Sequence, residues 1–204
     1  MKTPNYNKAR FLTSAAEISQ LPTDIGAEVA FVGRSNVGKS SALNALTKQK
    51  NLVRTSKTPG RTQLINFFAL SDLQRLVDLP GYGYAKVAKK TKQQWEQLID
   101  AYLRERKCLR GLVLLVDIRH PLQPFDMQVI TWAKEINLPI HILLTKADKL
   151  SFGAAKNVLQ KVQNKLKKIN SNISVQLFSA SKPIGCDVLQ KVLNNWLIVK
   201  KLGE

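Results

Sequence analysis

The sequence has few cysteines, few acidic residues and no long apolar run. Its two cysteines, Cys108 and Cys186, lie far apart, with neither a C-x-x-C spacing nor a histidine at metal-binding spacing. This argues against a zinc site and against a disulfide framework. No apolar stretch approaches the roughly 18 residues of a membrane-spanning helix, and residues 1–22 lack the apolar core of a signal peptide. We therefore expect a chain with no membrane span, folded in the reducing cytoplasm.

Acidic residues are scarce relative to basic ones. The 204 residues include 32 Lys and Arg against 14 Asp and Glu, which gives a formal net charge of +18. A charge this far from zero favours a polyanionic partner, with nucleic acid first and an anionic membrane as a weaker alternative. A surface of solvated lysines that binds nothing is the remaining interpretation.

Short apolar runs alternate with longer helical patterns along the chain. The runs begin at Glu28, Leu64, Gln74, Gly111, Pro139 and Val175. The helical patterns cover residues 39–47, 92–107, 126–136, 154–169 and 187–200. This alternation predicts an α/β fold, a three-layer sandwich around a mixed, mostly parallel sheet of six strands. One strand should be antiparallel, because the short turn at residues 71–73 cannot hold a parallel crossover.

One segment fits the phosphate-binding pattern G-x-x-x-x-G-K-[ST]. Its residues are Gly33, Arg34, Ser35, Asn36, Val37, Gly38, Lys39 and Ser40. A strand pattern precedes the segment and a helix pattern follows it, so its backbone N–H groups would face phosphate oxygens at a helix N-terminus. Lys39 would reach the β- and γ-phosphates, and the Ser40 hydroxyl would bind Mg²⁺. The motif alone does not distinguish ATP from GTP.

Two further segments would complete the phosphate end of the site. The first consists of Asp78, Leu79, Pro80 and Gly81, and the second of Gly60, Arg61, Thr62, Gln63 and Leu64. Asp78 ends an apolar strand, where a carboxylate can meet Mg²⁺ through water and the Gly81 N–H can bind the γ-phosphate. The second segment ends a loop that could close over the γ-phosphate. We predict Ser40 and Thr62 as the Mg²⁺ ligands, preferring Thr62 because it leads directly into the next strand.

The base of the nucleotide is expected to lie against Thr145, Lys146, Ala147 and Asp148, which follow the strand at Pro139. The Asp148 carboxylate can accept hydrogen bonds from guanine N1–H and the exocyclic amine, and adenine offers neither group at that edge. The Lys146 stem can lie along the base plane. Phe178, Ser179 and Ala180 follow the last strand, and a backbone N–H of this loop could contact guanine O6. The predicted ligand is therefore GTP or GDP.

Taken together, these motifs resemble the five sequence boxes of the translation-factor-class GTPases related to Era. Four longer strings, at residues 55–67, 79–85, 117–122 and 144–150, more narrowly resemble the bacterial EngB family, also called YsxC or YihA. The resemblance implies a Ras-like P-loop GTPase fold, with residues 1–24 as an N-terminal extension and residues 25–204 as the GTP-binding domain. It also implies a Mg²⁺-dependent GTPase that acts in assembly of the large (50S) ribosomal subunit and is needed for normal cell division and septation. An rRNA partner would explain the positive charge.

Three residues bear on affinity and turnover. Thr145 stands where many GTPases have Asn, so we expect the loss of an amide that tethers the base loop to the phosphate loop, and modest affinity. Tyr82 stands where Ras-like proteins have the Gln that orients water, so hydrolysis should be slow, and no side chain is assigned as catalytic. Asn36 occupies the position at which related GTPases bind K⁺; an Asn bonded to its own loop backbone is the alternative.

Two other functional classes stay open from the sequence. A P-loop phosphotransferase is disfavoured by Asp148 and by the absence of a recognisable lid domain, and a constitutive RNA-binding module would hold its nucleotide only for structure.

The lysines that follow Gly81 could carry a nucleotide-sensitive loop to RNA; they are Lys86, Lys89, Lys90 and Lys92. We expect a monomer, and we expect His120 and His141 to be structural.

Overall fold

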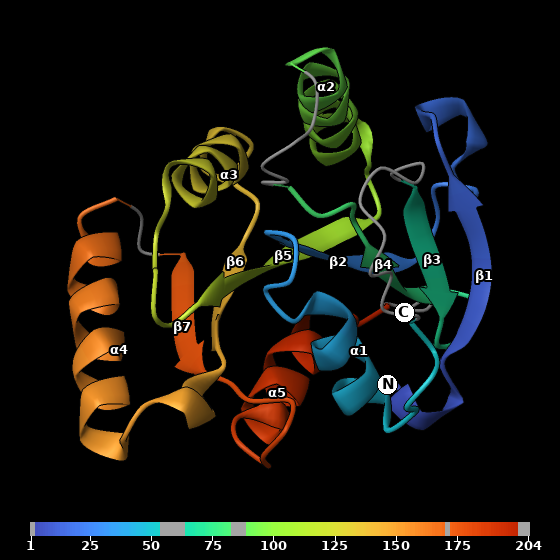
Figure 1. Ribbon diagram of the computed structural model, residues 1–204. Helices are drawn as coiled ribbons and strands as arrows, with labels where there is room; N and C mark the ends of the chain where they lie inside the picture. The colour runs from blue at the N-terminus through green and yellow to red at the C-terminus, as the bar shows by residue number, and fades with distance from the viewer. Residues whose placement is uncertain (1–2, 54–63, 83–88, 170–171, 200–204) are drawn as a thin grey trace.

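In a computed structural model of the chain, residues 3–53, 64–82, 89–169 and 172–199 are described, apart from the side chains of residues 89–92. The strands are β1 (Arg10–Ala15), β2 (Ala27–Gly33), β3 (Ile65–Ala69), β4 (Gln74–Asp78), β5 (Leu109–Asp117), β6 (Ile140–Thr145) and β7 (Ile173–Leu177). The α-helices are α1 (Lys39–Thr47), α2 (Lys89–Glu105), α3 (Pro124–Glu135), α4 (Phe152–Lys167) and α5 (Cys186–Trp196). Short 3₁₀ turns η1, η2 and η3 cover Tyr6–Lys8, Ile18–Gln20 and Ala147–Lys149. Figure 1 shows the helices on both sides of one twisted sheet.

The sheet confirms the predicted α/β sandwich and its single reversed strand. Its order is β1-β3-β4-β2-β5-β6-β7, and β3 runs antiparallel to both neighbours while the other pairs are parallel. The predicted number of six strands is wrong, because the N-terminal residues add β1 beside β3, with Ala15 opposite Ile65. This edge strand has no clean alternation, since Arg10, Phe11 and Leu12 are all exposed, so sequence periodicity does not reveal it.

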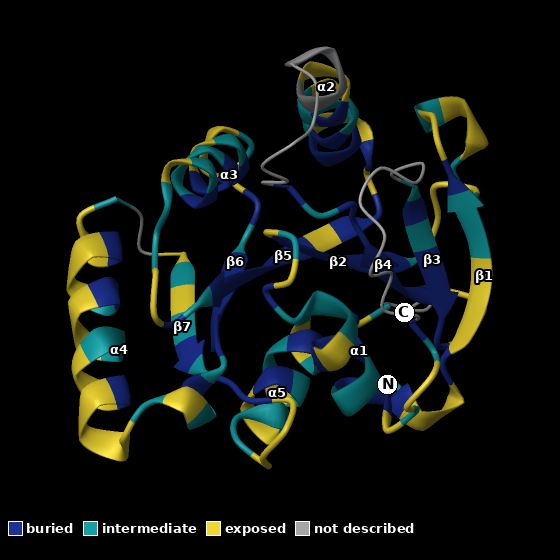
Figure 2. Cartoon of the chain, in the orientation of Figure 1, coloured by how far each residue is buried: buried dark blue, intermediate teal, exposed yellow. Residues whose placement is uncertain are grey.

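Two apolar layers fix the helices on the sheet. On one face, side chains of α2, α3 and α4 pack against alternate strand residues such as Ala30, Leu112 and Leu114. On the other face, α1 and α5 pack against Val29, Phe31 and their neighbours. Figure 2 shows the central strands buried on both sides, which is why they read as continuous apolar runs in the sequence.

Local capping decides where the helices begin. Helix α3 begins two residues before the predicted start, because Pro124 occupies its first position and Gln123 and Asp126 form a capping box. Helix α4 likewise begins early, since the Ser151 hydroxyl accepts a hydrogen bond from the Ala154 N–H. Helix α5 ends at Trp196, short of the predicted residue 200. No helix in the described ranges is both long enough and apolar enough to cross a membrane.

A buried ionic network closes the end of the sheet opposite the phosphate motif. The Glu28 side chain is fully buried and accepts hydrogen bonds from Arg75 Nε at 2.7 Å, Arg106 Nη2 at 2.6 Å and the Tyr102 hydroxyl at 3.1 Å. A buried carboxylate needs such partners, because an unpaired charge there is strongly destabilising. The network ties β2, β4 and α2 together and so fixes the strands whose other ends carry the site.

Candidate nucleotide-binding site

The phosphate motif forms a tight loop between β2 and α1. Gly33 ends β2 where a Cβ atom would lie 2.8 Å from the Leu115 carbonyl oxygen, so only glycine fits. Gly38 has φ of +104° and precedes α1 with no side-chain cap. The N–H groups of the first turn, from Lys39 onward, therefore have no capping side chain, and such groups can bind an anion. The binding of phosphate here stays a prediction.

The segment after β4 holds the loop from its other side. The Ser35 N–H donates to the Tyr82 carbonyl at 2.7 Å, and the Tyr82 N–H donates to the Gly33 carbonyl at 3.3 Å. Gly81 lies against the same loop, since a Cβ atom there would be 3.4 Å from the Ser35 nitrogen. The loop also contains Asn36, which is exposed at φ of +61°. Gly81 therefore lies directly beside the phosphate loop.

Oxygen donors for a divalent cation lie beside this loop. The Lys39 ammonium pairs with the Asp78 carboxylate, and the two side chains are only 12% and 7% exposed. Ser40 follows Lys39 in the first turn of α1. A hydroxyl and a carboxylate are the hard oxygen ligands that Mg²⁺ prefers, so these residues fit the ion. Leu64 lies directly before β3, whereas Gly60, Arg61, Thr62 and Gln63 lie outside the described residues, and their roles stay predictions.

The base loop is tied to the phosphate loop through Thr145. Its hydroxyl donates to the Val37 carbonyl at 2.8 Å and lies 3.2 Å from the Val116 carbonyl. The threonine lacks the amide that Asn would offer, but its hydroxyl makes a tether between the two loops. Parallel pairing in the order β2-β5-β6 brings the end of β6 close enough to the loop for a short side chain to reach it.

A second carboxylate, which the sequence analysis did not assign, orients the predicted base-stacking lysine. Lys146 has φ of +59° and its ammonium lies 2.9 Å from Asp117 Oδ2 at the end of β5. Arg119 also donates to Asp117, at 2.7 Å, and this bond above all holds the pKa of Asp117 well below its usual range. Asp117 begins one of the strings that resemble the EngB family, which was the only sequence signal for it.

The predicted guanine-reading residue is held by a serine. Asp148 Oδ1 accepts a hydrogen bond from the Ser179 hydroxyl at 2.6 Å, and this bond lowers the pKa of Asp148. The Ser179 N–H donates to Ile184 and the Phe178 N–H donates to Leu144. Among the described residues, this leaves Ala180 as the member of the three-residue loop whose N–H has no partner. If this loop contacts guanine O6 as predicted, the Ala180 N–H is the one free to do so.

The side chain of Tyr82 points away from the phosphate loop into an aromatic cluster. It is 4% exposed, its hydroxyl donates to Asp126, and its ring centroid lies 4.2 Å from that of Phe125. The Trp95 indole N–H donates to the Pro80 carbonyl at 2.9 Å. Burial raises the pKa of Asp126. The segment after β4 is therefore anchored to α2 and α3 by groups that sequence reasoning missed.

The lysines proposed as an RNA-contacting loop are not placed by the structure. Lys86 lies outside the described residues, and Lys89, Lys90 and Lys92 belong to the start of α2, where side chains are not described. That hypothesis stays a prediction.

Comparison with known proteins agrees with this geometry. A family model described as "50S ribosome-binding GTPase" matches residues 28–146. A Coxiella burnetii protein (strain RSA 493) named "Probable GTP-binding protein EngB" is 58% identical over 193 residues, covering 95% of this chain and 94% of its own. The protein of the same name from Photorhabdus laumondii is 56% identical over 200 residues, 98% and 95% of the two chains. The chain belongs to the EngB family of GTP-binding proteins.

Solved structures of GTP-binding proteins have the same fold as this EngB family member. A crystal structure titled as a probable GTP-binding protein engB superposes with a TM-score of 0.67 at 21% identity, covering 84% of this chain and 98% of the other. Era bound to MgGDPNP and nucleotides 1506–1542 of 16S ribosomal RNA superposes with a TM-score of 0.64 at 24% identity, covering 87% and 58%. At these identities the likeness concerns the P-loop GTPase fold alone.

Proposed function

We propose that this protein hydrolyses GTP slowly with Mg²⁺ and acts as a nucleotide-dependent switch in the assembly of the large ribosomal subunit. The observation that carries the proposal is the meeting of both ends of a guanine-nucleotide site at one edge of the sheet, joined by Thr145 and Val37. The ribosomal part rests on the family description, which contains the words "50S ribosome-binding", and on the net charge of +18.

The residues of the chain have separate tasks in this proposal. The N–H groups at the start of α1 and the Lys39 ammonium bind the phosphates, so Lys39 exchanges Asp78 for a phosphate oxygen. Ser40 and Thr62 would hold Mg²⁺, with Asp78 nearby through water; the ion supplies positive charge for the phosphate oxygens. Hydrolysis is slow because the buried Tyr82 side chain leaves no water-orienting group at that position.

The switch would operate through Gly81. Its N–H is expected to bind the γ-phosphate, so hydrolysis removes that contact. The next residue, Tyr82, is bonded to the phosphate loop by its backbone and to Asp126 by its hydroxyl. A shift at Gly81 would therefore be transmitted to the start of α3 and, through Trp95 and Pro80, to α2.

The cellular setting follows from the family resemblance. We infer a cytoplasmic monomer whose loss depletes large ribosomal subunits and, as a consequence, impairs division and septation. K⁺ at Asn36 is an optional further cofactor that would add positive charge beside the phosphates.

The experiment is co-sedimentation of the purified protein with isolated large and small ribosomal subunits at one fixed salt concentration. We expect pelleting with the large subunit in a non-hydrolysable GTP analogue, and much less in GDP or with the Lys39→Ala variant. Equal pelleting in GTP analogue, GDP and no nucleotide would favour the constitutive RNA-binding alternative. No pelleting would remove the ribosomal role. In a turnover assay, GDP formation that requires an added acceptor, with transfer of the γ-phosphate to that acceptor and no release of free phosphate, would favour a phosphotransferase.

A further inference from the structure

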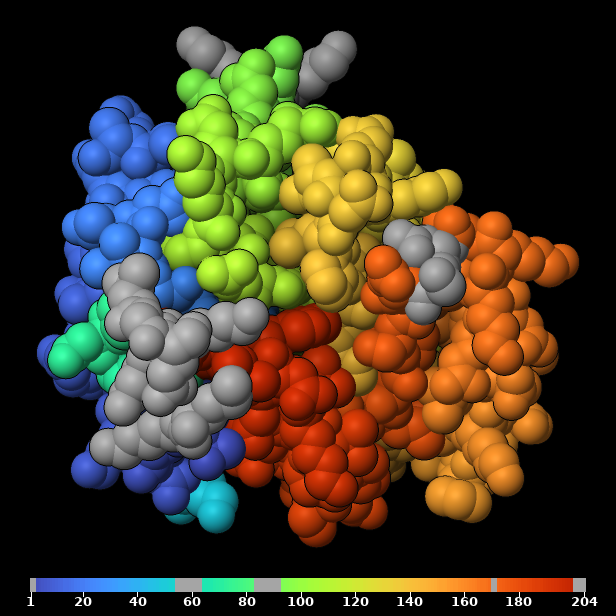
Figure 3. Space-filling model, turned by 180° about the vertical axis from the view of Figure 1, so that it is seen from behind, coloured from blue at the N-terminus to red at the C-terminus, as the bar shows by residue number. Residues whose placement is uncertain are grey.

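Helix α4 carries an exposed face that is strongly basic and has no acidic residue. Residues 149–186 contain no Asp or Glu. The lysines of this stretch are Lys149, Lys156, Lys161, Lys165, Lys167, Lys168 and Lys182. All of them are exposed, and Figure 3 shows α4 (orange) along an outer edge of the molecule. We infer that this face, from the base loop along α4, is the surface that binds RNA phosphates; the inference rests on the proposed function.

The geometry of α4 arranges these charges in rows. Ala155, Val162 and Leu166 are buried on the side of the helix that packs on the sheet beside β7. On the outer side, Lys161, Lys165 and Lys168 follow one another at i, i+4 and i+7, so that neighbouring side chains start about 5–6 Å apart. Exposed amides lie between this row and the lysines on the other flank; they are Asn157, Gln160 and Asn164. The face therefore offers ammonium groups for phosphates and amides for hydrogen bonds.

The charge of helix α4 is not neutralised by the residues that the structure describes. In the described part of the chain, no lysine of α4 forms an ion pair. Helix α2 contrasts with it, since Arg104 pairs with Asp100 four residues earlier and with Glu135 of α3. Like charges at i, i+4 weaken a helix by about 0.2–0.5 kcal/mol per pair. Interaction with the helix dipole offsets this in the last turn, but Lys156 and Lys161 lie outside that turn.

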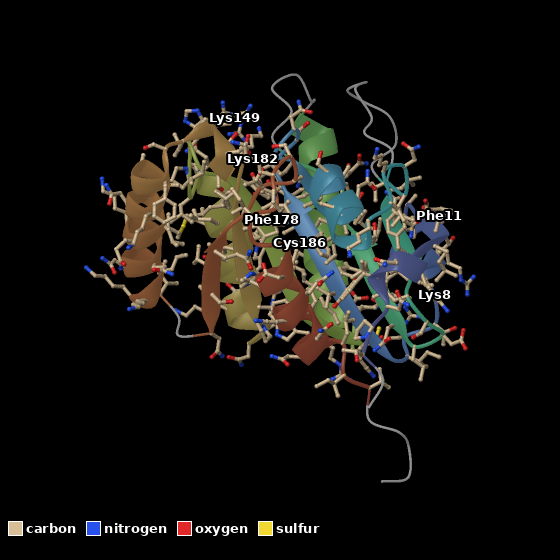
Figure 4. The ribbon with its side chains drawn as sticks, turned by 90° about the horizontal axis from the view of Figure 1, so that it is seen from below. Lys8, Phe11, Lys149, Phe178, Lys182 and Cys186 are labelled. Atoms are coloured by element: carbon tan, nitrogen blue, oxygen red, sulfur yellow. The ribbon has the colours of Figure 1, made fainter. Side chains whose placement is uncertain are left out.

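The basic face begins at the nucleotide site. Lys149 ends the η3 turn next to Asp148, with which it pairs at 3.7 Å, and its side chain is still 64% exposed. The Lys182 N–H donates to the hydroxyl of Ser179, the residue that holds Asp148. Figure 4 shows Lys149 and Lys182 at the same end of the molecule. RNA on this face would thus contact the loops that hold guanine.

RNA fits this face better than a lipid surface does. A helix that lies in a membrane interface must turn an apolar face to the lipid, and the apolar face of α4 is already used on the sheet. Phe152 is the exposed aromatic residue at its start, 80% exposed, and a single aromatic ring suits stacking on an unpaired base. Amides among lysines suit phosphate and 2′-hydroxyl groups.

The test compares three full-length variants with the unaltered protein. K161Q/K165Q/K168Q removes the row on α4. K8Q/K134Q/K191Q removes the same charge from exposed lysines on η1, α3 and α5. K161R/K165R/K168R keeps the charge on α4. Binding to purified large-subunit rRNA is measured by filter retention over a range of KCl concentrations in GTP analogue, and GDP affinity and the thermal midpoint are measured for each protein.

We expect the α4 Gln variant to bind rRNA about tenfold or more weakly and the slope of log K against log[salt] to shrink by about 2–3, as for three lost phosphate contacts. The Arg variant should bind like the unaltered protein, and the K8Q/K134Q/K191Q control should lose less than about threefold. GDP affinity should be the same in all four. If the Arg variant keeps its rRNA affinity while the α4 Gln variant loses it, the loss of positive charge, rather than of folding, is the cause.

Other outcomes overturn the inference in distinguishable ways. Unchanged rRNA binding by the α4 Gln variant, with GTP-dependent sedimentation intact, would reject this face and leave the proposed function standing. Equal losses of rRNA affinity in both Gln variants would indicate that binding depends on the net charge of the protein and not on this face. An α4-dependent affinity for vesicles of phosphatidylserine and phosphatidylcholine, with none for rRNA, would make the face a membrane site. Absence of all ribosome and rRNA binding by the unaltered protein would reject the proposed function as well.

Discussion

The Thr145 hydroxyl donates a hydrogen bond to the Val37 carbonyl at 2.8 Å, joining the loop predicted to bind guanine to the loop predicted to bind phosphate. Thr145 is 3% exposed and Val37 is 4% exposed, so the bond is shielded from water. It places the two recognition loops in a fixed relation before nucleotide arrives. Binding then costs less ordering of the loops, which is the usual benefit of a preorganised site.

Replacing Thr145 by Val keeps the shape of the side chain and removes the hydroxyl. The buried Val37 carbonyl would lose its donor at a cost of about 1–3 kcal/mol. We expect GDP and GTP analogue to bind about five- to tenfold more weakly, measured by calorimetric titration. Thr145→Ser, which keeps the hydroxyl, is the matched control. Equal affinities for T145V and the unaltered protein would mean that the two loops are positioned by other contacts.

Replacing Asp148 by Asn should change which base is bound. The carboxylate can accept from the guanine N1–H and amine, whereas an amide NH₂ can instead donate to the C2 carbonyl of xanthine. GTP affinity should fall about 100-fold or more, and xanthosine triphosphate should bind better than GTP. Competition against a fluorescent GDP analogue measures both. Retention of guanine preference by D148N would show that other groups read the base.

Replacing Tyr82 by Phe should destabilise the fold in a pH-dependent way. It leaves the buried Asp126 carboxylate without its hydroxyl donor, at a cost of about 1–3 kcal/mol at pH 7. Burial already raises the pKa of Asp126 above its unfolded value. The folded state therefore binds the proton more tightly, and the contribution of Asp126 to stability falls as pH rises through the window between the two values. Loss of the donor should widen that window.

The measurement is urea unfolding of the unaltered protein, Y82F and Y82F/D126N from pH 4 to pH 8. The difference in unfolding free energy between the unaltered protein and Y82F should grow with rising pH. Asn at position 126 carries no titrating group, so Y82F/D126N should lose the part of the pH dependence that Asp126 causes. A pH-independent effect of Y82F would indicate that the hydroxyl matters for packing alone.

Asn36 offers a test for a monovalent cation. Its side chain is exposed and, among the described residues, makes no hydrogen bond to its own loop. Such a bond would have explained an Asn at this position without a ligand. We expect turnover in KCl to exceed turnover in NaCl by about tenfold or more, and Asn36→Ala to abolish the difference while GDP binding persists. Phosphate release is measured with and without ribosomes. Equal rates in both salts under both conditions would rule out a K⁺ requirement.

The sequence by itself determined the fold class and the position of both loops along the chain. The phosphate motif, Asp78 to Gly81, and Thr145 to Asp148 are contiguous strings, in which local spacing alone puts the right groups after a strand or before a helix. The alternation of apolar runs then brings the carboxyl ends of parallel strands to one edge. Such features need no knowledge of which distant residues meet.

Only the tertiary structure decided the contacts between those strings. Thr145 meets Val37, Lys146 meets Asp117, and Tyr82 meets Asp126, all across different strands or helices. Such pairs form only if the two side chains are placed to within a few tenths of an ångström. Strand register and helix packing set these positions, and local sequence patterns do not encode them. The edge strand β1 and the unpaired charge of α4 belong to the same class, because both are defined by what the rest of the chain does or does not place beside them.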